Sequence, residues 1–230
     1  MTARSNPPIL NAPLAVRWLT GITVLIHVFQ AIAPDPVDSL LFELFGLFPA
    51  RYGAPANGAI DTIALVTMPF GHMLLHADWM HLIINMAFLL AFGSAIGRRM
   101  GPAQFLILYV LCGLAGALLW IWLYPTSTAL LIGASGAISG MMGAAARVSI
   151  WPPHRTGSAL PFWRRSTVIT FVVIWLVLNI VFGVLPIMAP GDAGGIAWQA
   201  HLGGFIAGFF LISSFDGRGR IDPFVPYMRY

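Results

Sequence analysis

The sequence predicts an all-α, polytopic membrane protein built as a bundle of six transmembrane helices. Three observations predict this fold class: the composition, the recurrence of apolar runs, and the placement of the arginines. The chain of 230 residues is 58% hydrophobic and only 9% charged, with a mean hydropathy of +0.83. Soluble domains carry roughly a quarter charged residues. The pI near 9.8 then reflects membrane topology, and no nucleic-acid partner is expected.

Six apolar runs approach the length of about 20 residues that a bilayer-spanning helix needs. Turn-forming or charged residues separate them, as connecting loops require. Arg98 and Arg99 follow the second run, and a segment rich in glycine and proline follows the fifth. The predicted spans are residues 17–33, 80–97, 103–124, 133–151, 167–189 and 195–214.

The basic residues, all of them arginine, fall almost entirely on one side of these six spans. Arginine excess marks the cytoplasmic side, so both termini are expected in the cytoplasm. The all-arginine basic set and the high alanine and glycine content suit a GC-rich prokaryotic genome, so the expected location is a bacterial inner (plasma) membrane. Arg51 alone lies on the outer side, together with most of the acidic residues. The arginines on the predicted cytoplasmic side are Arg4, Arg17, Arg98, Arg99, Arg147, Arg155, Arg164, Arg165, Arg218, Arg220 and Arg229.

The first outer loop, residues 34–79, is long and partly apolar. Its stretch LLFELFGLF, residues 40–48, has one acid among apolar residues, which predicts a short helix lying in the outer membrane interface. Long loops in compact bundles are more often functional than spacers. The loop is therefore expected to belong to the working part of the molecule.

Four polar side chains are expected at one depth inside the bundle. Polar groups within spans are costly and usually face the bundle interior or a wet cavity. At a rise of 1.5 Å per residue, these four stand about 18 to 25 Å above the charged residues that mark the inner surface. In a hydrocarbon core about 30 Å thick, they lie in the outer half. The four residues are His81, Asn85, Ser135 and His201.

Their residue types and positions predict nucleophilic catalysis. Ser135 falls at the start of a helix, where unpaired N–H groups and the helix dipole suit an oxyanion. His201 can act as its base, since histidine titrates near neutrality. His81 and Asn85, four residues apart on one helical face, can stabilise the negative charge. A Ser–His dyad is the preferred interpretation, with Asp192 as a less favoured third member.

Close helix packing is required to bring the histidine to the serine. Small residues at four-residue spacing allow membrane helices to approach closely. The fourth and sixth predicted spans both carry such residues near the candidate pair, so an imidazole within about 3 Å of the hydroxyl is sterically feasible. The glycines expected to pack around the site are Gly133, Gly136, Gly140, Gly204 and Gly208.

The same residues also allow other functions. The Gly-x-Ser-Gly stretch alone is typical of helix packing, and isolated polar residues often bridge two helices. Five histidines, His27, His72, His76, His81 and His201, suggest a haem or metal protein as another class. No helix carries two histidines at haem-stacking separation, and no cofactor or metal is expected. A transporter is disfavoured because no paired repeats are visible. The lone Cys112 cannot form an internal disulfide.

The same residues resemble a known family. The segments GHMLLHADWMHLIINMAFLLAFG, GASGAISGMMGA and AWQAHLGGFIAG are similar to the three signature segments of the rhomboid family of intramembrane serine proteases, in the same order and spacing. The resemblance implies a bacterial-type six-helix core in which Ser135 is the nucleophile and His201 its general base. It implies that His81 and Asn85 stabilise the oxyanion, and that His76 is a secondary site residue.

The resemblance also implies a domain organisation and a function. Residues 1–16 form a short cytoplasmic segment, residues 17–215 a six-helix rhomboid protease domain, and residues 216–230 a short cytoplasmic tail. The expected activity is that of a serine-type endopeptidase that cleaves transmembrane segments of single-span membrane proteins near the outer membrane face. The alternative is a catalytically silent rhomboid-like module that binds membrane proteins. The natural substrate and the oligomeric state do not follow from the sequence.

Two positions depart from the family pattern. Family members often carry a glutamate near the inner end of the second span, where this chain has Gly97. Many also carry a Trp-Arg pair in the first outer loop, and residues 34–79 contain none. Both features are thought to brace that loop, so its anchoring in this chain is left open.

Overall fold

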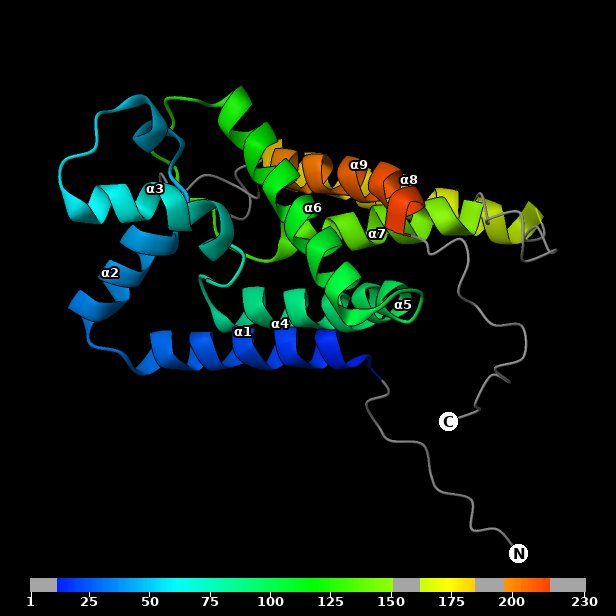
Figure 1. The fold of residues 1–230 in the computed structure, drawn as a ribbon. Coiled ribbons are helices and arrows are strands. Elements are labelled where there is room, and N and C mark those ends of the chain that lie inside the picture. Colours follow the sequence, from blue (N-terminus) through cyan, green and yellow to red (C-terminus); the bar gives the residue numbers. More distant parts are fainter. Residues whose placement is uncertain (1–11, 151–161, 185–196, 216–230) are drawn as a thin grey trace, which may run out of the picture.

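The structure is a computed structural model, and it describes residues 12–150, 162–184 and 197–215. Within these ranges the chain forms helices joined by short connections (Figure 1). The predicted tail 216–230, Asp192 and most of the segment 1–16 lie outside the described residues. In chain order the elements are α1 (Leu14–Ile32), α2 (Asp35–Phe45), η1 (Pro49–Gly53), α3 (Ala59–Gly71), α4 (Trp79–Phe88), η2 (Leu89–Gly93), α5 (Ser94–Gly97), α6 (Pro102–Leu123), α7 (Ser135–Ile150), α8 (Phe162–Val184) and α9 (Trp198–Phe215).

The six predicted spans correspond to α1, the α4–η2–α5 segment, α6, α7, α8 and α9. By length and composition, three stretches among the described residues can cross a bilayer: Leu14–Ile32, Trp79–Gly97 and Pro102–Leu123. The helix α7 is shorter, with 16 residues, and residues 136–144 are all buried. Because this buried stretch is packed against neighbouring helices, its glycines Gly136, Gly140 and Gly143 allow close helix contact.

The second span is not the single α-helix that the sequence predicted. The helix α4 ends at Phe88, and a π-helical turn, η2, separates it from the four residues of α5. Leu89 in this turn is fully buried, and Gly93 lies so close that a Cβ there would come within 2.9 Å of the Leu89 side chain. Wider π turns within helices often occur near functional sites, and this one lies directly below the segment that carries His81 and Asn85.

The first outer loop contains more helix than the sequence predicted. The expected helix at 40–48 instead spans Asp35–Phe45, because Pro36 suits the first turn and Asp35 and Asp38 favour the positive end of the helix dipole. A further helix, α3, was not predicted. Its 13 residues are mostly apolar, but they are too few to span a bilayer. They also contain Pro69, and proline in a sequence usually indicates the end of a helix.

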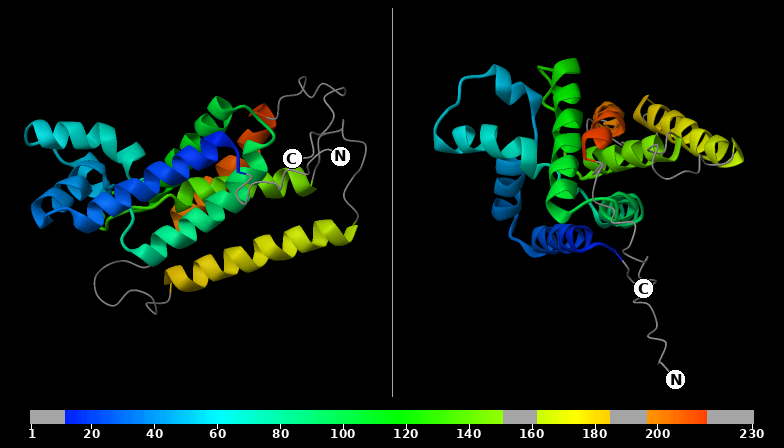
Figure 2. Two further views of the ribbon diagram at one scale, coloured as in Figure 1. Left: turned by 90° about the horizontal axis from the view of Figure 1, so that it is seen from below. Right: turned by 45° about the vertical axis from the view of Figure 1, so that its right-hand side comes forward.

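The helices α6, α7 and α9 form the centre of the bundle. Figures 1 and 2 show α9 beside α7, with α6 crossing both, while α8 lies along the outside. The main apolar core gathers between α6, α7 and the second span, around the fully buried Phe105, Leu108 and Met141. Cys112 is buried there as a free thiol, and it faces Gly140, where a Cβ would collide with its side chain.

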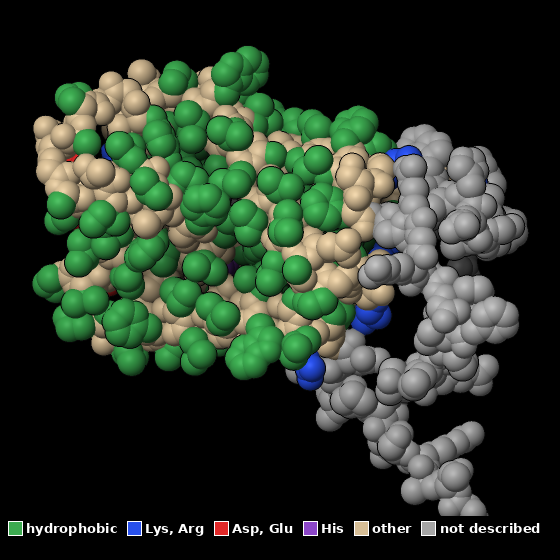
Figure 3. Space-filling view, viewed as in Figure 1, with side chains coloured by type: hydrophobic (Ala, Val, Ile, Leu, Met, Phe, Trp, Pro, Cys, Tyr) green, Lys and Arg blue, Asp and Glu red, His purple; other side chains and the backbone are tan. Residues whose placement is uncertain are grey.

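The surface separates apolar and charged groups along the bundle. Hydrophobic side chains cover the flank in Figure 3, and arginine side chains gather at the end of the bundle that adjoins the undescribed segments. A flank of this kind suits a hydrocarbon environment, whereas soluble monomers rarely expose large contiguous apolar patches. Exposed apolar residues such as Leu25, Val66 and Trp122 are 68%, 67% and 76% exposed.

Candidate active site

The turn before α7 sets the position of Ser135. Gly133 has a φ of +108°, a backbone conformation that side chains other than glycine's rarely adopt. Its N–H donates to the carbonyl of His72 over 2.8 Å. A Cβ at Gly133 would lie 2.7 Å from Nε2 of His81, so the turn and this imidazole are in close contact. Ser135 follows as the first residue of α7, where backbone N–H groups have no partner within the helix.

His201 lies in the first turn of α9, opposite Ser135. Its Nε2 is 2.7 Å from the Ser135 hydroxyl oxygen, a hydrogen-bond distance. The two side chains come from elements 66 residues apart in the chain. Both are partly buried, so the pair is enclosed by the bundle and still within reach of its surface.

Glycines allow α7 and α9 to approach closely enough for this contact. A Cβ at Gly204 would collide with the backbone carbonyl of Gly136, and one at Gly208 with that of Gly140. Gly143 faces the carbonyl of Phe205 in the same way. The backbones of α7 and α9 are therefore in contact along one line of small residues. This close packing places the first turn of α9 beside the N-terminus of α7.

His81 and Asn85 approach the same turn from α4. Asp78 caps this helix, its carboxylate accepting from the His81 N–H at 2.8 Å. The Asn85 amide donates one hydrogen to the His81 carbonyl at 2.9 Å, and the second hydrogen is available. Asn85 is only 4% exposed. The structure thus brings His81 against Gly133 and places Asn85 one turn below it.

His76 and His27 form a buried group of rings behind His81. The ring centroids of His76 and His81 are 5.0 Å apart, and those of His27 and His76 are 6.3 Å apart. His27 also meets Trp79 edge-on at 4.7 Å. Burial, reinforced by the neighbouring His81, lowers the pKa of His76 to about 4, so it is neutral at physiological pH. Among the described residues no group of three or more His, Cys, Asp or Glu is arranged to hold a metal ion.

Asn179 is the residue of this site that sequence reasoning left unplaced. The sequence shows it as a polar residue within the fifth predicted span, but a depth estimate along one helix cannot show which neighbour it faces. In the structure its Oδ1 lies 2.5 Å from Nδ1 of His201. The contact links α8 to α9 through residues 22 positions apart in the chain, and part of the segment between them lies outside the described residues.

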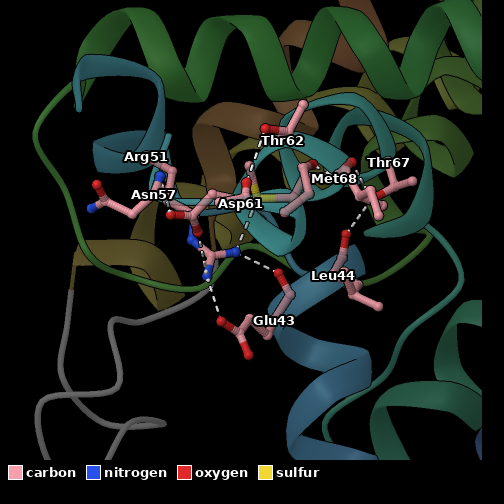
Figure 4. A network of polar contacts seen from close by, with 11 residues as sticks. Glu43, Leu44, Arg51, Asn57, Asp61, Thr62, Thr67 and Met68 are labelled. Carbon is pink, nitrogen blue, oxygen red and sulfur yellow. Dashed lines mark hydrogen bonds and ion pairs between the residues drawn. The ribbon is translucent and has the colours of Figure 1, made fainter. Parts of the chain in front are cut away.

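The anchoring of the first outer loop, left open by the sequence, rests on Arg51. Its guanidinium, in η1, bonds the Glu43 carboxylate at 3.2 Å and the Glu43 backbone carbonyl, and it pairs with Asp61 at 3.7 Å (Figure 4). It also contacts the sulfur of Met68 at 4.0 Å. One side chain thereby joins α2, η1 and α3, and Thr67 adds a bond to the Leu44 carbonyl.

This anchored loop is attached to the chain just before Ser135. Leu47 and Leu131 form an isolated antiparallel bridge with N–O distances of 3.1 and 2.9 Å. The Ala50 N–H donates to the Ser127 carbonyl at 3.0 Å. Gly97, where family members often carry a glutamate, packs against Pro13 of the chain before α1, since a Cβ there would lie 3.2 Å from the Pro13 side chain. A glutamate side chain would displace that contact.

The fold and the site together define a polytopic helical membrane protein with a serine–histidine pair at a helix N-terminus. Residues 63–215, which include both side chains, match the family described as "Rhomboid domain". The chain therefore belongs to the rhomboid family, and the predicted family and the all-α polytopic fold are confirmed. By the same match and its apolar helices, it is a multi-pass integral membrane protein.

Several curated proteins are similar to the chain. RHOMBOID-like protein 5 of Arabidopsis thaliana is 30% identical over 139 residues, which are 60% of this chain and 40% of that protein. Rhomboid-like protease 3 of Toxoplasma gondii is 28% identical over 206 residues, or 88% and 69% of the two chains. Rhomboid protease GluP of Bacillus subtilis is 30% identical over 142 residues, or 62% and 24%. The chain spans about 40% of the length of the two Arabidopsis relatives it matches.

Proposed function

We propose that the chain is a serine-type intramembrane endopeptidase that cleaves transmembrane segments of single-span membrane proteins near the outer membrane face. The observation that carries the proposal is the 2.7 Å contact between Ser135 Oγ and His201 Nε2 at the N-terminus of α7. Two of the similar proteins are named as rhomboid proteases. Family membership supports the activity, and the contact supports these two residues as its catalytic pair.

The proposed mechanism assigns a role to each side chain. His201 takes the proton of Ser135, whose oxygen attacks a substrate carbonyl. The Ser135 N–H, Asn85 and His81 hold the oxyanion of the tetrahedral intermediate. His201 then gives the proton to the leaving amine, and water hydrolyses the acyl-enzyme. The neutral His76 lies against the His81 ring, with the ring centroids 5.0 Å apart.

The position of the pair favours a particular class of substrate. A helical backbone hides its carbonyls in internal hydrogen bonds, so the scissile segment must unwind to reach Ser135. Substrates are therefore single-span proteins whose helix is weak near the outer face. Small residues around the cleaved bond are expected from the resemblance to the family. We place the chain in a bacterial inner membrane with both termini in the cytoplasm, in keeping with the arginine distribution.

The experiment is cleavage of a weak-helix transmembrane substrate in liposomes by the full chain and two serine variants. Ser135→Ala is expected to lower the cleavage rate by more than about a thousandfold, because removing the nucleophile leaves only binding and oxyanion contributions. Ser139→Ala is the matched control, because Ser139 lies one turn deeper on the same helix and is buried; it is expected to cleave normally. Equal rates for Ser135→Ala and the unchanged chain would contradict the proposal.

The alternative of a catalytically silent binding module gives a different result in the same assay. It predicts no cleavage by the unchanged chain and a membrane partner that remains bound after Ser135→Ala. The unchanged chain and Ser135→Ala can each be purified from the same membranes together with their bound proteins. Cleavage by the unchanged chain and retention of a partner by Ser135→Ala then separate the two functions.

A further inference from the structure

The amide of Asn179 contacts the candidate base at the nitrogen that faces away from Ser135. Asn179 Oδ1, His201 Nδ1 and Nε2, and Ser135 Oγ form a continuous line with contacts of 2.5 and 2.7 Å. The three side chains come from α8, α9 and α7. We propose that Asn179 is a positioning residue that turns the Ser135–His201 dyad into a three-residue relay; this rests on the proposed protease function.

The orientation of the Asn179 amide follows from its second contact. Its Nδ2 donates to the Trp175 carbonyl, one turn earlier in α8, at 2.8 Å. The reversed amide would place its oxygen against this carbonyl, and two acceptors repel. The amide oxygen, which can only accept, therefore faces His201 Nδ1.

This orientation selects one tautomer of His201. A neutral imidazole carries one N–H and one lone pair, and the hydrogen bond made by one nitrogen decides the state of the other. Because Asn179 offers only an acceptor, the proton sits on Nδ1 and the lone pair of Nε2 points to the Ser135 hydroxyl. That is the form in which His201 can take the serine proton.

A second contact fixes the same two helices one turn deeper. The rings of Trp175 and Phe205 stack with centroids 5.1 Å apart and an interplanar angle of 24°. Trp175 precedes Asn179 by four residues, and Phe205 follows His201 by four, so both contacts lie on the facing sides of α8 and α9. The amide is thus held at a constant height relative to the imidazole.

An amide suits this position better than a carboxylate. In serine proteases with a full triad, the aspartate holds the correct tautomer and stabilises the imidazolium. An ionised carboxylate on α8 would require burial of a charge among apolar helices, which is expensive. Asn179 selects the His201 tautomer but carries no charge to stabilise the imidazolium. Its removal is therefore expected to lower the catalytic rate less than removal of a triad aspartate does.

The kinetic test uses Asn179→Leu and Asn179→Asp in the full chain. Asn179→Leu removes the acceptor at similar volume, and it is expected to lower kcat about tenfold with KM little changed, the effect of one lost hydrogen bond in the transition state. Asn179→Asp keeps an acceptor oxygen for His201 Nδ1, and its protonated carboxyl can donate to the Trp175 carbonyl as the amide does, so it is expected to restore most of kcat. The same Asn→Leu change at Asn57, an exposed residue of the outer loop, is the control and leaves both constants unchanged.

A spectroscopic test separates this proposal from the proposed function. Nitrogen NMR of histidine-labelled protein distinguishes the two imidazole tautomers, with His201→Gln assigning the signal. The unchanged chain is expected to show His201 protonated at Nδ1, and Asn179→Leu a mixture of tautomers. An unchanged tautomer and kcat within about twofold of the parent in Asn179→Leu would overturn the role of Asn179, even where Ser135→Ala abolishes cleavage. A chain without protease activity would still answer the tautomer question.

Discussion

Gly133 ties the conformation of a single residue to the position of the candidate nucleophile. Its φ of +108° and its contact with the His81 imidazole both exclude a side chain. Gly133→Ala is expected to lower the free energy of unfolding by about 1–3 kcal/mol, the cost of a strained backbone, and to lower cleavage further by displacing His81.

The control for this change is a glycine with open space around it. Gly21 lies within α1 and has no atom within 4 Å of a Cβ placed there, so Gly21→Ala is expected to stabilise α1 by about 0.5–1 kcal/mol. Thermal unfolding in detergent and substrate cleavage measure both variants. A Gly133→Ala protein as stable and active as the Gly21→Ala protein would contradict the account of the turn.

Two buried histidines in the segment between α3 and α4 make stability depend on pH. Burial lowers the pKa of His72 and of His76 from 6.5 to about 4. Between these values the unfolded chain binds more protons than the folded chain, so stability falls as the pH falls. The free energy of unfolding is therefore unaffected by these two histidines above about pH 6.5, and it decreases as the pH falls from 6.5 toward 4.

Thermal unfolding from pH 4 to 7 tests this dependence. His76→Gln removes one of the two groups and is expected to give a shallower loss of stability toward low pH than the unchanged chain. An identical slope in the two proteins would show that His76 is not held neutral by burial.

At the scale of elements, Arg51 is expected to hold the outer loop as one unit. It satisfies the carbonyl of Glu43 at the end of α2, where helical carbonyls lack partners, and it pairs with carboxylates from two helices. Arg51→Gln is expected to cost about 1–3 kcal/mol, as for hydrogen bonds to charged groups. Lysine is expected to restore only part of this, since a single ammonium cannot reproduce the guanidinium fork.

Limited proteolysis within residues 35–71 measures this effect, with Arg99→Gln as a matched arginine control at the opposite end of the bundle. Faster cutting of the loop in Arg51→Gln alone is the expected result. Equal cutting in the two variants would mean that the loop is anchored without Arg51.

The elements also show how far sequence reasoning reaches. Apolar runs and arginine placement predicted the long helices in order, because both signals are local and repeat along the chain. The π turn at Leu89–Gly93 and the helix α3 were missed, because their formation depends on packing against distant elements. The brace at Arg51 carried only an indirect signal, namely a lone arginine on the acidic outer side.

The candidate site was more predictable than the elements around it. Depth, helical spacing and residue type group Ser135, His201, His81 and Asn85, and the structure brings the first three together at the N-terminus of α7, with Asn85 one turn below His81. Asn179 could not be joined to them, because its partner lies on another helix and depends on the rotation of α8. The rotation of a helix about its axis is set by packing against neighbouring helices. When nearly all residues of a helix are apolar, their spacing does not show which face meets which neighbour.

For the whole molecule, the distribution of arginines predicts the orientation in the membrane. Arginine side chains gather at one end of the bundle (Figure 3), and the positive-inside rule places that end in the cytoplasm. A reporter that is active only in the cytoplasm is expected to be active when it is fused after Arg99. A reporter that is active only outside the cytoplasm is expected to be active when it is fused after Ala56. A periplasmic signal after Arg99 would contradict the assigned orientation.

The most direct test of the central claim is covalent labelling of the full chain in membranes with a fluorophosphonate, which reacts with activated serines. Mass spectrometry is expected to find the label on Ser135, with labelling lost in His201→Ala and retained in Ser139→Ala. Label on Ser139, or equal labelling of Ser135 in the presence and absence of the His201 imidazole, would contradict the claim that this 2.7 Å contact activates the serine.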